Sequence, residues 1–173
     1  MYPKAYLNYL IHFHGDRDYF ECHEVLEEHW KEAQRAERKL YWVGLIQLAV
    51  GLYHQRRGNF KGAYRMMNNA IDIIKKERDS LTKLGLDYEE LLSIVLKRVN
   101  EIQNQVPYKS FTLPISDKKL LSTCIESCET KGLTWGIDSD ITDHYLVNKH
   151  MLRDRSEVIN ERERQKRLKE RDI

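Results

Sequence analysis

Apolar residues recur at spacings of three and four along most of the chain, which is the spacing of positions on one face of an α-helix. The pattern predicts helices over about residues 3–14, 18–36, 38–57, 60–84 and 87–102. The segment at 38–57 is apolar on nearly every side, which is typical of a central, buried helix. We therefore expect an all-α protein, a compact bundle of about five helices with a C-terminal helical extension.

Capping residues support these boundaries. Asp18 is followed three positions later by Glu21, a pair that resembles a capping box and predicts a helix start. Asn59 and Asp87 are the expected N-caps of two later helices, and Gly85 is a typical C-terminal stop between them.

The pattern changes after the fifth predicted helix. Two prolines within residues 106–115 predict an extended connector laid over the surface. The connector separates a bundle domain at residues 1–105 from a helical extension at residues 116–173. From residue 153 onward, eight basic and six acidic residues are interleaved. This favours a solvated, charged tail helix, with a partner-docking helix or a contact with RNA as the alternatives.

The composition indicates which kinds of partner and which cellular compartment to expect. The 29 basic and 27 acidic residues leave a net charge of +2, which argues against a dedicated nucleic-acid-binding protein. Three cysteines in a chain that needs no disulfide framework indicate a reducing compartment. The first residues do not show the basic region followed by an apolar region that is typical of a signal peptide. The most apolar stretch of the chain is too short to span a bilayer. We expect a cytoplasmic protein without membrane contact.

The second predicted helix carries the first chemically interesting group. On a helical projection, His23 and Glu27 fall inside the apolar stripe, and Glu24 lies at its margin. An imidazole and a carboxylate four positions apart can share a hydrogen bond or one ion. If both are buried, both must find polar partners.

The third predicted helix offers such partners. Gln47 and His54 share a stripe with Gly44 and Gly51, and two glycines seven apart inside a helix indicate a close approach of a neighbouring helix. We expect that neighbour to be the second helix. The four polar residues of the two helices would then form one buried cluster: His23, Glu27, Gln47 and His54.

Two interpretations of this cluster remain open. In one, the side chains satisfy one another as a buried hydrogen-bond network that sets the helix register. In the other, His23, Glu27 and His54 bind a divalent metal ion, Glu24 acts as a general base and Gln47 supports the ligands. The spacing matches neither the zinc-protease motif nor the paired Glu-x-x-His motifs of di-metal bundles.

Three motifs together resemble a known family. They are Phe20-x-x-His23-Glu24-x-x-Glu27-x-x-Trp30, then Gly44-Leu45-Ile46-Gln47-x-Ala49 with His54, and then Gly58-Asn59-x-x-Gly62-Ala63. The set resembles the bacterial and archaeal domain-of-unknown-function family 309. The resemblance implies a small helical bundle and no activity, because none is established for that family. The positions expected to be structural are Trp30, Gly44, Gly51, Gly58, Asn59 and Gly62.

No nucleophile motif, phosphate-binding loop or cofactor fingerprint is recognisable in the chain. We therefore expect an interaction or scaffold protein that binds another protein or a second copy of itself. The alternative is a metal-binding protein or a metal-dependent hydrolase that uses His23, Glu27 and His54.

Overall fold

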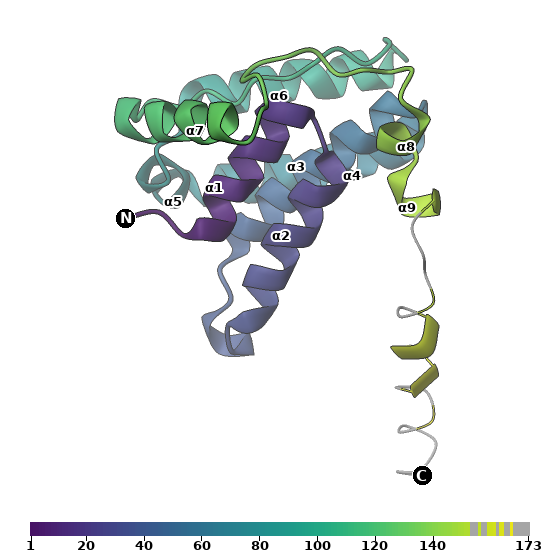
Figure 1. The fold of residues 1–173 in the computed structure, drawn as a ribbon, viewed down its shortest axis with the longest axis horizontal. Helices are drawn as coiled ribbons and strands as arrows, with labels where there is room; N and C mark the ends of the chain where they lie inside the picture. The colour runs from purple at the N-terminus through teal and green to yellow at the C-terminus, as the bar shows by residue number, and fades with distance from the viewer. Residues whose placement is uncertain (153–155, 157–158, 162, 165–166, 168–173) are drawn as a thin grey trace.

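Helices account for all of the regular secondary structure in the computed structural model, which describes residues 1–152, 156, 159–161, 163–164 and 167 (Figure 1). The all-α prediction is confirmed. Within these residues, β-type pairing is limited to one isolated bridge between Leu86 and Ile115. The helices are α1 (Lys4–Ile11), a π-helical turn (His12–Asp16), α2 (Tyr19–Glu32), a 3₁₀ turn (Arg35–Glu37), α3 (Leu40–Arg56), α4 (Phe60–Lys76), α5 (Arg78–Lys83), α6 (Tyr88–Gln103), α7 (Lys118–Thr130), α8 (His144–Val147) and α9 (Lys149–Leu152).

The predicted caps are confirmed at three helix starts. A side-chain oxygen of Asp18 accepts a hydrogen bond from the Glu21 amide at 2.9 Å. The same contact is made by Asn59 at the start of α4 and by Asp87 at the start of α6, each at 3.0 Å. Each bond satisfies an amide that the first turn of a helix leaves without a partner.

The bundle holds more helices than the five predicted. The segment at residues 60–84 divides at Glu77 into α4 and α5, and the break lets Leu81 enter the core, where it is buried. The second predicted helix ends at Glu32 rather than near Ala36. There the guanidinium of Arg38 donates to the carbonyls of Lys31 and Ala33, both at 3.2 Å, and so satisfies carbonyls at the end of the helix.

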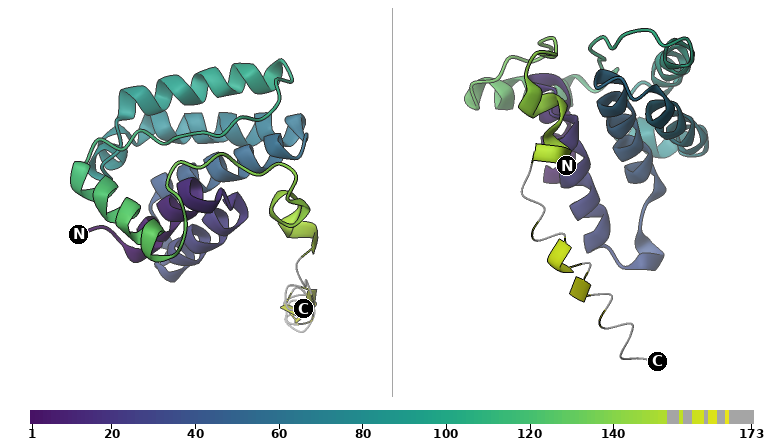
Figure 2. Two further views of the ribbon diagram at one scale, coloured as in Figure 1. Left: turned by 45° about the horizontal axis from the view of Figure 1, so that its top comes forward. Right: turned by 90° about the vertical axis from the view of Figure 1, so that its right-hand side faces the viewer.

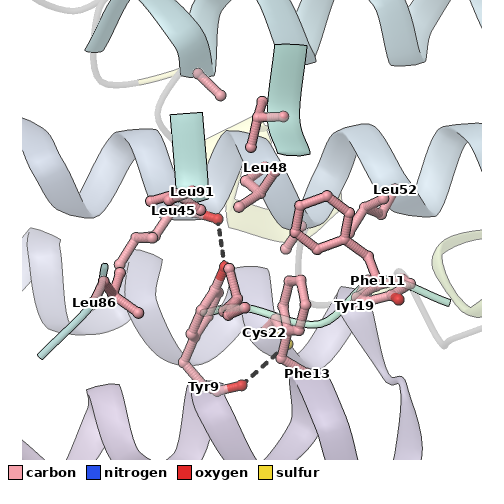
Figure 3. Packing of buried hydrophobic residues seen from close by; sticks show 14 of the residues in the cluster. Tyr9, Phe13, Tyr19, Cys22, Leu45, Leu48, Leu52, Leu86, Leu91 and Phe111 are labelled. Atoms are coloured by element: carbon pink, nitrogen blue, oxygen red, sulfur yellow. Dashed lines mark hydrogen bonds between the residues drawn. The ribbon is translucent and has the colours of Figure 1, made fainter. Parts of the chain in front are cut away.

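α3 lies at the centre of the bundle, as its all-round apolar pattern predicted. It packs against α2 and α4, while α1 packs against α2 and α6 against α4 (Figure 1). Figure 3 shows aromatic rings of α1, α2 and the connector meeting leucines of α3 in the core. The hydroxyl of Tyr9 donates to the carbonyl of Leu45 at 2.9 Å and ties α1 to α3 inside this core.

The connector runs back alongside α6 toward α7 (Figure 2). It is extended, as predicted, but it is not merely laid over the surface. The side chains of Phe111 and Leu113 are buried in the hydrophobic core, and Leu120 and Cys124 of α7 join the same cluster.

The helical extension expected over residues 116–173 begins with α7 and continues with the two short helices α8 and α9, which are separated at Asn148. The charged tail helix expected over residues 153–173 falls largely outside the described residues. Among the described residues, no helix has the length and apolar character needed to cross a membrane.

One histidine is part of the core. His14 is fully buried; its Nδ1 donates to the carbonyl of Leu10 at 2.9 Å, and its Nε2 accepts from the amide of Leu113 at 3.0 Å. The ring of Trp135 stacks on the imidazole with centroids 4.2 Å apart. The ring must stay neutral, because protonated Nε2 could no longer accept the Leu113 amide. Burial, joined by the charge of Arg17, lowers the pKa of His14 to about 4.

This histidine makes stability depend on pH. Because the folded-state pKa lies below the ordinary value of about 6.5, the unfolded chain binds more protons between these values. The free energy of unfolding should therefore fall by about 3 kcal/mol as the pH drops from about 6.5 to 4. Urea denaturation of the His14→Gln variant should show a smaller loss of unfolding free energy over this range than wild type does. Equal pH dependence of wild type and His14→Gln would contradict the assignment.

Candidate functional site

A cluster of one histidine and two carboxylates lies on α2. The ligand atoms of His23, Glu24 and Glu27 all lie within 4.8 Å of one another. His23 Nδ1 is 3.1 Å from Glu24 Oε1, and its Nε2 is 3.5 Å from Glu27 Oε2. The other oxygen of Glu27 is 3.1 Å from Lys31 Nζ. We call His23, Glu24 and Glu27 the carboxylate–histidine cluster.

The cluster is more open to water than the sequence predicted. The side chains of His23, Glu24 and Glu27 are 27%, 37% and 36% exposed. The expectation that His23 and Glu27 are buried is therefore wrong. Because water reaches all three groups, they do not require polar partners from α3.

The two α3 residues expected to join the cluster lie elsewhere. His54 Nδ1 is 3.2 Å from the side-chain nitrogen Nδ2 of Asn59, the residue that caps α4. Burial, followed by the charges of Arg57, His150 and Arg65, lowers the pKa of His54. Gln47 has a buried Oε1 for which the described residues provide no hydrogen-bond partner. Among the described residues, the candidate ligand atoms that lie together are those of His23, Glu24 and Glu27, and His54 is not in this group.

The two glycines of α3 explain this difference. A Cβ added to Gly44 would lie 2.8 Å from Ile73 Cγ2, and one added to Gly51 would lie 2.9 Å from Met67 Cγ. Ile73 and Met67 both belong to α4. The close approach marked by the glycines is therefore with α4 and not with α2.

The most deeply buried polar side chains lie outside the predicted cluster. They are His14, Arg17, Asp18, Gln55, Arg56 and Arg98. These residues could not be recognised as a site from the sequence, because arginines and a glutamine near helix ends look like ordinary surface residues. The one available signal was His14, which falls in the apolar stripe of the first predicted helix.

Two of these arginines hold the segment that follows α7. Arg17 Nε donates to the carbonyl of Ile137 at 2.7 Å, and its Nη1 donates to the carbonyls of Phe13 and Phe111. Arg56 Nη1 donates to the carbonyl of Arg17 at 2.7 Å and to Ser139 Oγ at 2.8 Å. We call residues 135–152, which include α8 and α9, the C-terminal strap.

The far end of the strap is held by charged and aromatic contacts. Lys149 Nζ lies 2.5 Å from Asp18 Oδ2 and 3.3 Å from Glu21 Oε2. Burial opposes the charge on Lys149, but the hydrogen bond to Asp18 and the two carboxylates prevail and raise its pKa. His150 Nδ1 is hydrogen-bonded to the hydroxyl of Tyr53, and Arg57 contacts its Nε2 at 3.0 Å.

The outward face of the strap carries both large apolar and polar side chains. Five of its large apolar side chains are between 47% and 65% exposed: Ile137, Ile141, Tyr145, Met151 and Leu152. Val147 is the one buried side chain of α8 and α9. Lys149 and His150 therefore face the bundle. The five large apolar side chains face water, together with the exposed polar residues Asp138, Asp140, Thr142, Asp143 and His144.

Comparison with known proteins places the chain in a family. The model for Domain of unknown function (DUF309) matches residues 6–66, which carry the carboxylate–histidine cluster and His54. The chain is also 51% identical over 174 residues to "Uncharacterized protein YpuF" of Bacillus subtilis (strain 168), an alignment that covers 99% of this chain and 100% of that protein. No solved structure matches the chain significantly. With these matches, the resemblance drawn from the motifs is confirmed, and the chain belongs to the DUF309 family.

Proposed function

We propose that the protein is an interaction module that binds a protein surface through the outward face of the C-terminal strap. The observation that carries the proposal is the polarity of the strap, with Lys149 and His150 turned toward the bundle and large apolar side chains turned toward water. Exposed groups of large apolar residues mark interaction sites on proteins that otherwise bury such residues.

The way in which the strap is held supports this proposal. Its anchors are hydrogen bonds from buried arginines and ion pairs of Lys149, which bury little apolar surface of α8 and α9. An apolar side chain gains about 25 cal/mol per Å² when it leaves water. The exposed apolar side chains of the strap would gain this free energy if a partner protein covered them.

Introducing charged side chains on the strap tests the proposal. The double variant Ile141→Lys and Leu152→Lys should lower affinity for a captured protein partner, or self-association of the chain, by at least about tenfold. Both side chains are more than half exposed, so the melting temperature should stay unchanged. Affinity capture with quantitative mass spectrometry and sedimentation at several concentrations measure the two forms of binding.

Leu96→Lys on α6 is the matched control, because Leu96 is also an exposed leucine, at 45%, but lies outside the strap. This variant should keep the partner and the oligomeric state of the wild type. The proposal fails if partners and self-association are the same for the strap variant and the wild type.

A second candidate function is binding of a divalent metal ion by the carboxylate–histidine cluster. One imidazole and two carboxylates suit ions such as Zn²⁺ or Mn²⁺, and three protein ligands leave positions open for water. The support for this candidate is the grouping of the three ligand atoms within 4.8 Å. Metal-dependent hydrolysis would require this binding as its first step.

Calorimetric titration of chelator-treated, tag-free protein with Zn²⁺ and with Mn²⁺ tests the metal site. His23→Ala and Glu24→Gln should remove one equivalent of binding. His54→Ala should keep it, and so should His29→Ala, whose imidazole lies on the same helix but beside Glu32. Loss on His54→Ala with retention in Glu24→Gln would restore the ligand set predicted from the sequence. No binding by wild type, or equal loss in His29→Ala, would eliminate the site.

A further inference from the structure

We propose that a hollow beside the N-terminus binds a small soluble aromatic anion, a flat apolar body that carries a carboxylate or sulfonate. The hollow lies between the first residues of the chain, the start of α3, the end of α5 and the start of α7. Its volume of about 800 Å³ is within the range of small-molecule sites in proteins. It is separate from the strap and from the carboxylate–histidine cluster.

The lining of the hollow is mainly apolar and aromatic. Trp42, Leu84 and Leu120 line it, and all three side chains are part of the buried core. The rings of Tyr2 and Tyr41 also line it. Aromatic side chains bind flat rings by stacked or edge-to-face contacts, so this lining favours an aromatic body over a sugar or a polar peptide.

The charges around the hollow favour an anion. Lys83 and Lys119 line it, both are exposed, and neither forms an ion pair with a carboxylate of the described residues. The carboxylate of Asp117 is already engaged, because it accepts the Tyr2 hydroxyl at 2.7 Å and the amides of Lys119 and Leu120 at 2.8 and 3.1 Å. The lining thus carries two ammonium groups against one carboxylate. The charge of Lys119 also acts on Asp117, but the balance of side-chain charge around the hollow still favours a ligand anion.

The same contacts hold the walls of the hollow in place. The bond from Tyr2 to Asp117 fastens the N-terminal residues to the start of α7. Gly85 lies beneath this bond with a φ of +79°, and a Cβ there would be 2.8 Å from the Tyr2 hydroxyl oxygen. The carbonyl of Gly85 accepts the amide of Ser116 at 2.8 Å, which ties the end of α5 to the same wall. A ligand would therefore enter a site that is already formed.

Trp42 adds a specific donor. Its side chain is 5% exposed and lines the hollow, and its indole N–H makes no hydrogen bond to the described residues. An indole N–H can donate to an oxygen of a bound ligand, so Trp42 offers the ligand a hydrogen-bond donor as well as a ring face.

Two fluorescent probes with the same aromatic body test the proposal on the full chain. We expect 8-anilinonaphthalene-1-sulfonate, an anion, to bind at one site more tightly than neutral N-phenyl-1-naphthylamine. The double variant Lys83→Glu and Lys119→Glu should weaken the anion by about tenfold and leave the neutral probe unchanged. Lys118→Glu, on the neighbouring residue of α7 that does not line the hollow, should bind both probes as wild type does.

A variant that fills the hollow tests whether the probes bind there. Thr123 is exposed and lines the hollow, so Thr123→Trp should weaken both probes while the melting temperature is retained. The proposal is overturned if Lys118→Glu weakens binding of the anion as much as the Lys83→Glu and Lys119→Glu double variant does, or if a folded Thr123→Trp variant binds both probes like wild type. It is also overturned if the wild type does not prefer the anion.

Discussion

The buried guanidinium groups of Arg17 and Arg56 determine where the C-terminal strap lies. A charge removed from water must be surrounded by hydrogen-bond acceptors, and carbonyl oxygens of the chain serve this purpose here. Arg17 finds them in residues 13, 111 and 137, and Arg56 finds them in residues 17 and 146 with Ser139 Oγ. Because burial of charge places the strap, its large apolar side chains are left toward water, and the proposed interaction surface follows from this arrangement.

Much of the fold could be predicted from local patterns in the sequence. Spacings of three and four locate helices, and Asp18, Asn59 and Asp87 mark helix starts because a cap acts on an amide only a few positions away. The family could be recognised for the same reason, since its motifs lie on neighbouring turns of α2 and α3 and at the start of α4. The grouping of His23 with Glu27 is likewise a consequence of helical spacing within one helix.

The features that were predicted wrongly or missed depend on tertiary structure. A helical projection shows which residues share a face but not which neighbour that face meets, so Gly44 and Gly51 were assigned to α2 although they contact α4. The same error placed His54 with His23. The burial of Arg17 could not be found either, because its acceptors are backbone carbonyls, which every residue has, up to 120 positions away.

The orientation of the strap determines which of its side chains water can reach. Hydroxyl-radical footprinting of the monomeric protein measures this exposure directly. Tyr145 and Met151, both 58% exposed, should be oxidised rapidly, whereas Tyr53, beneath His150 and 5% exposed, should be protected. Rapid oxidation of Tyr53, or protection of Tyr145 and Met151 in the monomer, would contradict a strap that turns Lys149 and His150 inward and its large apolar side chains toward water.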